Sequence, residues 1–203
     1  MIIHNVEQNS QEWLELRAGK PTASEFKKII TSSGEPSKSL DGYAETLAGE
    51  LYAGKPLDLW DGSKYTDYGH DMEAEARAWY EFTHQEVKQV GFVTDDNNLY
   101  GCSPDSLTLD NGSLEIKNLP KNHIKVLRYY HKHKKCPTDY YAQCQGQIGI
   151  AELDYCALLF YSPILPKLVI RIERDDVFQA KLATQLKAVL EERDKILKIL
   201  KEF

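Results

Sequence analysis

The hydrophobic periodicity of the sequence changes near residue 90, and this change limits the folds that are open to the chain. Before it, apolar residues recur with helical spacing in the segments 12–17, 23–30, 43–51 and 69–82. After it come short runs that are rich in β-branched and aromatic residues, which are typical of strands. The pattern therefore predicts a helical N-terminal section followed by a sheet.

The predicted strands fall into two groups. The first group comprises the segments 90–94, 99–102, 106–109 and 113–117, and the second comprises 155–161 and 168–173. A helical stretch at 139–151 separates the groups, which indicates a crossover connection, and a long amphipathic helix from Phe178 to Leu200 ends the chain. We therefore predict an α/β (α+β) fold in which helices flank a central mixed β-sheet, as one domain over residues 1–203.

The net charge of the whole chain argues against a partner as acidic as nucleic acid, but the distribution of the charges does not. The chain holds 25 Lys and Arg against 31 Asp and Glu, which gives a net charge of −6. Seven of the cations, however, lie between Lys117 and Lys135, a stretch with three His, two Tyr and no Asp or Glu. The remainder then has 18 Lys and Arg against 31 Asp and Glu. A basic run with aromatic residues is typical of a groove for a phosphodiester backbone; a solvated charged helix is the alternative.

Glu115 and Lys117 are an acid and a base two positions apart on a predicted strand, so their side chains project from the same face. Asp105 precedes them across a predicted turn. Two carboxylates can hold a hard cation such as Mg²⁺, and a nearby ammonium can position or deprotonate a metal-bound water for attack on a phosphodiester. If the chain brings them together, the three residues indicate a nuclease site; if it does not, they are ordinary surface residues.

The loop between the two strands decides whether Asp105 meets the other two residues. With a two-residue loop at 111–112, Asp105 faces Asn118 and lies on the wrong face of the sheet. With a three-residue loop at 110–112, in which Gly112 takes the left-handed bulge position, Asp105 lies opposite Lys117. Of the two, only the second, or an equivalent bulge, converges the three side chains.

Four blocks of the sequence follow one another in a familiar order. They are a W-x-x-x-R and T-A-S opening (Trp13–Ser24), G-x-x-x-E (Gly69–Glu73), a Pro-Asp and Glu-x-Lys box (Cys102–Lys117) and a Gln-bearing helix (Tyr140–Gln145). In this order they resemble the phage lambda-type alkaline exonucleases of viral recombination, which are PD-(D/E)xK nucleases. The resemblance covers about two thirds of the chain and implies a restriction-endonuclease-like core.

The resemblance implies roles for the central residues. Asp105 and Glu115 would ligate Mg²⁺, with Mn²⁺ as a possible substitute, together with the backbone carbonyl of Ile116. Lys117 would serve the attacking water.

Two further residues acquire roles in the same way. The resemblance implies that Glu73 holds water or a second metal; from the helical spacing alone, an i,i+4 ion pair with Arg77 is favoured. Gln143, on the predicted helix at 139–151, can orient the water or contact the DNA backbone, whereas a helix-surface Gln is ordinarily solvated.

The opening block predicts an anion site. Thr22 to Glu25 reads as a capping box, with Thr22 as N-cap and Ser24 in the first turn. Free amides at that helix end favour an anion, and Arg17 can reach it with a bidentate fork. The alternative is a plain helix cap with Arg17 on the surface. The resemblance implies that Arg17 and Ser24 hold the 5′-phosphate of a DNA end, and that Trp13, which is more often a core residue, packs near the terminal nucleotide.

The function that follows is a Mg²⁺-dependent 5′-to-3′ exonuclease on double-stranded DNA, which starts at a 5′-phosphorylated end. The cations that would track the duplex are Lys121, Lys125, Arg128 and Lys132. The resemblance implies a homotrimeric ring that leaves a 3′ strand for a single-strand annealing protein. A PD-(D/E)xK endonuclease or repair nuclease, and a non-catalytic DNA-end-binding module, are the alternatives.

Neither a signal peptide nor a membrane span is expected from this sequence. Its N-terminus lacks a basic start with an apolar stretch, and its apolar runs fall short of a bilayer. The four cysteines contain no C-x-x-C pair, which favours free thiols over a zinc site. We expect a cytoplasmic phage or prophage protein in a bacterial host, with no membrane partner.

Overall fold

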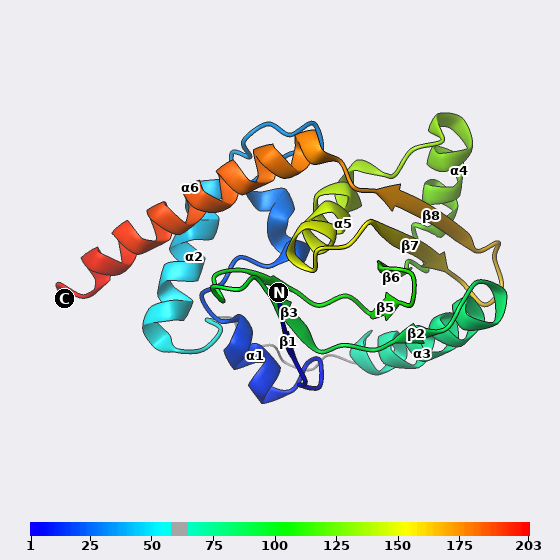
Figure 1. Cartoon of the computed structure of the whole chain (residues 1–203), viewed down its shortest axis with the longest axis horizontal. Coiled ribbons are helices and arrows are strands. Elements are labelled where there is room, and N and C mark those ends of the chain that lie inside the picture. Colours follow the sequence, from blue (N-terminus) through cyan, green and yellow to red (C-terminus); the bar gives the residue numbers. More distant parts are fainter. Residues whose placement is uncertain (58–64) are drawn as a thin grey trace.

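The computed structural model describes residues 1–57 and 65–203, with the backbone alone at 65–71. A five-stranded sheet lies at its centre (Figure 1). In spatial order its strands are β2 (Val87–Lys88), β5 (Ser106–Thr108), β6 (Gly112–Asn118), β7 (Tyr155–Tyr161) and β8 (Leu168–Glu173). Strands β6 and β7 pair in parallel and the other neighbours are antiparallel, so the sheet is mixed, as predicted.

Helices cover both faces of this sheet. The helix α3 (Tyr65–Thr83) packs on one face, and α4 (His123–His133) and α5 (Thr138–Ile150) pack on the other. The central strand β7 explains the arrangement, because every residue in it is buried and successive side chains enter the two opposite layers. A strand that is apolar on both faces needs cover on both. Because α4 and α5 connect the parallel strands β6 and β7, they form the predicted crossover.

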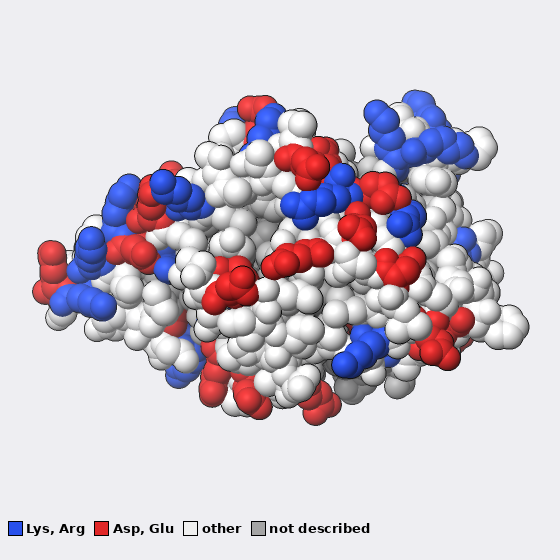
Figure 2. Space-filling view, viewed as in Figure 1, with Lys and Arg blue, Asp and Glu red and all other residues white. Residues whose placement is uncertain are grey.

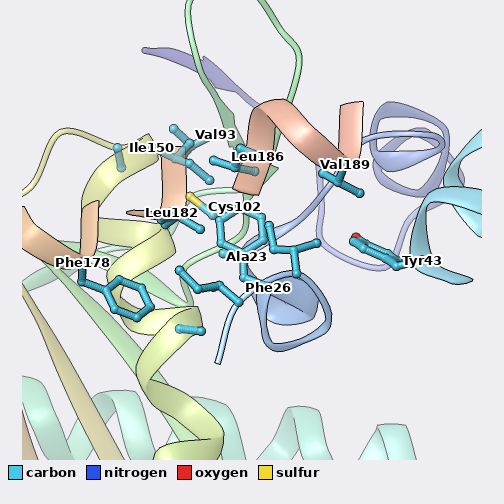
Figure 3. Close-up of a cluster of buried hydrophobic side chains, with 14 of the residues drawn as sticks. Ala23, Phe26, Tyr43, Val93, Cys102, Ile150, Phe178, Leu182, Leu186 and Val189 are labelled. Atoms are coloured by element: carbon cyan, nitrogen blue, oxygen red, sulfur yellow. The ribbon is translucent and has the colours of Figure 1, made fainter. Parts of the chain in front are cut away.

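The N-terminal section forms a second layer of packing around a separate apolar cluster. It consists of α1 (Gln11–Arg17), the 3₁₀ helix η1 (Ala23–Lys28), α2 (Leu40–Ala53) and a small sheet of β1 (Ile2–His4), β3 (Phe92–Thr94) and β4 (Gly101–Cys102). The long helix α6 (Asp176–Leu200) packs along α2 and extends past it to the C-terminus (Figure 1). Figure 3 shows Phe26 of η1 among Cys102 and the α6 residues Leu182 and Leu186.

These elements confirm the predicted fold class, with local differences. The segment 23–30 forms a short 3₁₀ helix rather than an α-helix, and β1 and β2 were not predicted. Both are short edge strands of two or three residues, too brief to produce a periodic signal. All four cysteines are free thiols, and three of them are buried. Within the described parts of the chain, no helix combines the length and the apolar character that a bilayer crossing requires.

The β5–β6 hairpin has a register that differs from both predicted ones. Ser106 lies opposite Leu114 and Leu107 opposite Ser113, so the loop is the three-residue segment 109–111. Asn111, not Gly112, takes the left-handed conformation, with φ of 64°. Continuing this register by one residue places Asp105 directly opposite Glu115, on the same face of the sheet. The three-residue loop was right in length but wrong by one position.

Candidate active site

Glu115 is the most enclosed charged group of the site, with 3% of its surface exposed. Its carboxylate accepts hydrogen bonds from the amides of two α5 side chains: Gln143 Nε2 to Oε1 at 2.6 Å and Gln147 Nε2 to Oε2 at 2.5 Å. The orientation of Gln147 is fixed in turn by the Ser113 hydroxyl, which donates to its Oε1 at 2.9 Å. Helix α5 therefore holds a buried carboxylate in one orientation, because both of its oxygens have donors.

Lys117 completes this cluster from the same strand. Its Nζ lies 2.6 Å from Glu115 Oε1, and the Tyr140 ring lies 5.8 Å away. Burial alone disfavours the ammonium, but Glu115 and Asp105 outweigh burial and raise the pKa of Lys117. The predicted placement is confirmed: Glu115 and Lys117 share one face of β6, and Leu114 and Ile116 face the opposite layer.

Asp105 joins the cluster through the backbone of the neighbouring strand. The Ile116 N–H donates to Asp105 Oδ2 at 2.5 Å. Since the N–H and C=O of one residue in an extended strand point to the same side, the Ile116 carbonyl is directed toward Asp105 as well. Burial, followed by the charges of Glu115 and Glu73, raises the pKa of Asp105 well above its usual range. The site therefore concentrates negative charge that its own residues do not balance.

Glu73 lies beside Asp105 but is paired with an arginine. Its Oε1 is 2.5 Å from Arg77 Nη2, which is the i,i+4 ion pair that the spacing favoured. Arg77 also donates from Nε to the Ser106 hydroxyl at 3.0 Å, so it ties α3 to β5. A cavity of about 330 Å³ is lined by both Glu73 and Asp105 and is walled by the segment 5–8. Glu73 thus faces the same space as Asp105 without touching the Glu115 cluster.

The donor set fits a hard divalent cation. Asp105, Glu115 and the Ile116 carbonyl offer only oxygen atoms, which Mg²⁺ prefers. Among the described residues, no group of three or more His, Cys, Asp or Glu is close enough to hold a metal, so such an ion would keep several water ligands, as Mg²⁺ commonly does. A cation would also relieve the repulsion that raises the pKa of Asp105.

A second cluster contains the residues of the opening block and is joined to the first. Trp13 Nε1 donates to the Ser103 hydroxyl at 2.9 Å, two residues before Asp105. The Arg17 guanidinium lies 4.0 Å above the Trp13 ring and 3.4 Å from the Thr22 hydroxyl. Burial lowers the pKa of Arg17, and none of the ion pairs among the described residues includes it. Glu25 and Glu50 line the same cavity and act on Arg17 by charge without forming an ion pair with it, so this half-buried guanidinium can still bind an anion directly.

Thr22 lies at the N-cap position of η1 as predicted, but the predicted capping box with Glu25 does not form. The Thr22 side chain makes no capping hydrogen bond, and Glu25 instead pairs with Lys28 at 2.7 Å. The short 3₁₀ turn explains the difference, because the Glu25 N–H already donates to the Thr22 carbonyl at 2.8 Å. The hydroxyls of Thr22 and Ser24 lie 3.4 Å apart, and that of Thr22 faces Arg17. The anion site therefore rests on side chains rather than on a helix end.

Sequence reasoning did not select Lys20, which lines the same cavity as Arg17, a space of about 540 Å³. Its Nζ donates to the Leu16 carbonyl at 2.7 Å, and burial, with Arg193 adding to it, lowers its pKa. Lys20 lies within the opening block but is not one of its motif positions, and the fold of the 18–21 turn places it on the cavity that Arg17 lines. Ser103 was not selected either, whereas Gln147 was expected beside Gln143 on one helix face and contacts Glu115 rather than water or DNA.

The basic residues Lys125, Arg128 and Lys132 share one face of α4, and Lys121 lies just before this helix. All four are exposed. Figure 2 shows a projection of blue groups at the upper right, where Figure 1 places α4. None of the ion pairs among the described residues involves a cation between 121 and 135. This surface is therefore an uncompensated basic patch, which we call the α4 patch.

The comparisons with known proteins agree with this geometry. A family model described as the YqaJ-like viral recombinase domain matches residues 12–154, most of the chain. The chain belongs to the YqaJ-like viral recombinase family. The matched range contains both clusters and the α4 patch; β7, β8 and α6 lie beyond it. A search of curated proteins found no match.

Solved structures place this YqaJ-like chain among PD-(D/E)xK alkaline exonucleases in fold. It is similar to an alkaline exonuclease, LHK-Exo, from Laribacter hongkongensis, with a TM-score of 0.81 and 28% identity over 95% of this chain and 97% of that one. A structure of LHK-Exo in complex with dAMP gives a TM-score of 0.81 and 27% identity over the same shares of the two chains. A phage-related exonuclease from Haemophilus somnus 129PT shares the fold, with a TM-score of 0.69 and 17% identity over 89% and 96%.

Proposed function

We propose that the chain is a Mg²⁺-dependent exonuclease that hydrolyses one strand of duplex DNA from a 5′-phosphorylated end. Membership of a viral recombinase family and the likeness to an alkaline exonuclease support the coarser conclusion, a DNA exonuclease. The observation that carries the finer proposal is the link between the two clusters. The Trp13–Ser103 hydrogen bond ties the stacked Trp13 and Arg17 side chains to the chain two residues before Asp105. An enzyme that recognises an end needs such a fixed separation between end and reaction centre.

In this proposal the reaction centre is built on β6. Asp105, Glu115 and the Ile116 carbonyl would hold Mg²⁺, or Mn²⁺ in its place. The bound ion supplies Lewis-acid charge and lowers the pKa of a water ligand. Lys117, fixed by Glu115, would orient the attacking water and offset the charge that develops on the phosphate. Gln143 and Gln147 would keep Glu115 in its binding orientation.

The flanking residues would position the substrate. Arg17, with the hydroxyls of Thr22 and Ser24, would bind the terminal 5′-phosphate, and Trp13 would pack near the terminal nucleotide. Glu73 would hold water or a second cation in the cavity that it shares with Asp105, after release from Arg77.

The α4 patch would contact the backbone of the duplex through Lys121, Lys125, Arg128 and Lys132. Phosphate contacts of this kind give affinity without sequence preference, which suits an exonuclease. The negative charge of the rest of the chain would keep the duplex on this path.

We further propose that the protein acts as a homotrimeric ring and leaves the 3′ strand for a single-strand annealing protein. A ring would give processivity, since an enclosed duplex cannot leave between steps. Light scattering of the purified chain measures its mass directly. A processive ring degrades a pre-bound duplex to completion in the presence of excess unlabelled competitor DNA, whereas a monomeric, distributive enzyme stops when the competitor is added.

The central experiment compares three DNA substrates of the same sequence. They are a linear duplex with 5′-phosphates, the same duplex with 5′-hydroxyls, and a covalently closed circle. Each is incubated with the protein in Mg²⁺ or in EDTA, with label near one 5′ end or one 3′ end. We expect rapid release of 5′-end nucleotides from the phosphorylated duplex, slower release from the hydroxyl duplex and no cleavage of the circle.

Two variants separate the proposed roles in this experiment. Asp105→Asn should abolish cleavage while DNA-end binding remains, because it removes a metal ligand and no DNA contact. Arg17→Ala should remove the preference for the phosphorylated end and leave a low rate on both ends. Cleavage of the closed circle would show that the protein is an endonuclease rather than an exonuclease. Early loss of the 3′ label would show that digestion starts at the 3′ end. Full activity of the Asp105→Asn variant would mean that the active site lies elsewhere in the protein.

A further inference from the structure

The turn between β5 and β6 is held in a register that its own sequence does not favour. Asn111-Gly112 is a strong signal for a two-residue loop, and that loop would move Asp105 to the other face of the sheet. The structure instead places the loop at 109–111. Some contact outside the turn must therefore select this register.

The side chain of Asp110 is the hub of that contact. Its Oδ1 accepts hydrogen bonds from the Tyr155 hydroxyl of β7, from the Thr108 hydroxyl at 2.8 Å and from Gln85 Nε2 at 2.9 Å. The Thr108 oxygen in turn accepts the Gly112 N–H at 2.8 Å. The three donors lower the pKa of Asp110 to about 2. A carboxylate on the loop is thus tied to both strands of the hairpin and to the strand beside it.

The Tyr155 ring fixes the position of Gly112 as well. A Cβ built on Gly112 would lie 2.3 Å from the ring, so only glycine fits at this place in β6. The Arg171 guanidinium of β8 stacks on the same ring, 3.3 Å from its centroid. Gly112 is therefore kept in the strand, opposite Tyr155 in the β6–β7 pairing, and is not available for the turn.

We propose that Asp110 and Tyr155 form a register lock, which determines whether the metal-binding carboxylates of the proposed nuclease assemble. Asp105 directly precedes β5 and Asp110 lies in the loop after it, so the two are at most about 17 Å apart along the chain. If the loop moved to 111–112, which Asn111-Gly112 favours, Asp105 would face Asn118 and would lie on the other face of the sheet from Glu115. Both residues act through Asp105 and are positioning residues.

The lock has a specific consequence for metal binding. If only a fraction of the molecules is in the register that binds the ion, the apparent dissociation constant rises by the inverse of that fraction. If loss of the lock leaves one molecule in ten in the native register, metal affinity falls about tenfold. Saturating metal selects the native register again, so the maximal cleavage rate should change little.

The test measures Mn²⁺ binding to the DNA-free protein by electron paramagnetic resonance of the free ion. The variants are Asp110→Ala and Tyr155→Phe. Tyr141→Phe is the matched control, because the Tyr141 hydroxyl likewise donates to a carboxylate, Asp175 Oδ2, at 2.8 Å. Thermal unfolding of each variant accompanies the titration. Tyr155→Phe and the control should lose similar stability.

We expect the Mn²⁺ dissociation constant to rise about tenfold in Asp110→Ala, less in Tyr155→Phe and not at all in Tyr141→Phe. The Mg²⁺ concentration for half-maximal single-turnover cleavage should rise in parallel, at an unchanged maximal rate. Unaltered Mn²⁺ affinity in Asp110→Ala, or an equal rise in Tyr141→Phe, overturns the lock.

The register lock rests on the proposed function only in taking Asp105 and Glu115 as metal ligands. Different results would therefore refute the lock and the exonuclease. A wild-type protein that binds Mn²⁺ and shows the variant effect, yet cleaves no DNA end, retains the lock and refutes the exonuclease. A wild-type protein that degrades DNA ends, with Asp110→Ala at wild-type metal affinity, retains the exonuclease and refutes the lock.

Discussion

Replacing Lys117 with methionine should destabilise the protein strongly without metal and only weakly with it. The substitution keeps the length of the side chain and removes its charge. It leaves Glu115, with 3% of its surface exposed, without the cation at 2.6 Å. Removing one partner of a buried ion pair costs about 3–5 kcal/mol. The two glutamine amides still donate to Glu115, and 24% of the Lys117 side chain is exposed, so we expect the lower end, about 3 kcal/mol.

Magnesium should reduce this loss. In the variant, a cation bound between Asp105 and Glu115 meets no competing ammonium and supplies the missing counter-charge. If the loss falls from about 3 to about 1 kcal/mol, linkage requires the variant to bind the ion about 30-fold more tightly than the wild type does. Cleavage should be abolished in both conditions, because the ion does not replace the group that positions the attacking water.

Urea unfolding followed by circular dichroism, in EDTA and in Mg²⁺, measures both quantities. Lys181→Met is the control, since it removes a Lys–Glu pair at 3.3 Å whose side chains are 43% and 68% exposed. It should cost at most about 1 kcal/mol, equally in both conditions. An equal loss for Lys117→Met with and without Mg²⁺, or no loss in EDTA, refutes the assignment of Glu115 and Asp105 as metal ligands opposed by Lys117.

Three further outcomes follow from shifted pKa values. Because the pKa of Asp105 is raised in the fold, its ionisation destabilises the metal-free protein as pH rises from about 4, so Asp105→Asn should melt higher than the wild type in EDTA at pH 7. Because burial and Arg193 lower the pKa of Lys20, its positive charge destabilises the fold below that pKa, and Lys20→Met should be more stable than the wild type at neutral pH. If Lys20 helps to bind an anion, added inorganic phosphate should stabilise this variant less than the wild type. A melting temperature of Lys20→Met below that of the wild type, or equal stabilisation of both proteins by phosphate, contradicts a role of Lys20 in anion binding. Because hydrogen bonding, first from Tyr155, lowers the pKa of Asp110 to about 2, its stabilisation is complete above about pH 4 and is lost as pH falls towards 2; the pH–stability curve of Asp110→Asn should lack this step.

Much of the site could be read from residue types and short spacings. The two-residue period of a strand puts Glu115 and Lys117 on one face, and the structure confirms it. The four-residue spacing of Glu73 and Arg77 likewise produced the expected ion pair. These predictions succeeded because the backbone geometry of one element fixes them, whatever that element packs against.

Predictions that depended on a choice between local conformations were less secure. At Thr22–Glu25 the capping pattern was present, yet the chain forms a 3₁₀ turn in which Glu25 pairs with Lys28. A cap contributes about 1 kcal/mol, which tertiary packing readily exceeds. Lys20 has no local signal, and its position beside Arg17 depends on helices distant in sequence: Glu50 accepts the Gly19 N–H, and Arg193 donates to the Gly19 carbonyl.

The sequence by itself therefore determined the order of elements, the mixed sheet with its crossover and the chemical groups of the proposed metal site, because periodicity and residue type are local properties. Only the tertiary structure decided the register that brings Asp105 opposite Glu115. Asn111-Gly112 by itself favours a two-residue loop, and the observed loop depends on the contact of Asp110 with Tyr155, 45 residues away in the chain. A contact between such distant residues exists only once β7 has paired with β6, so no local pattern contains it.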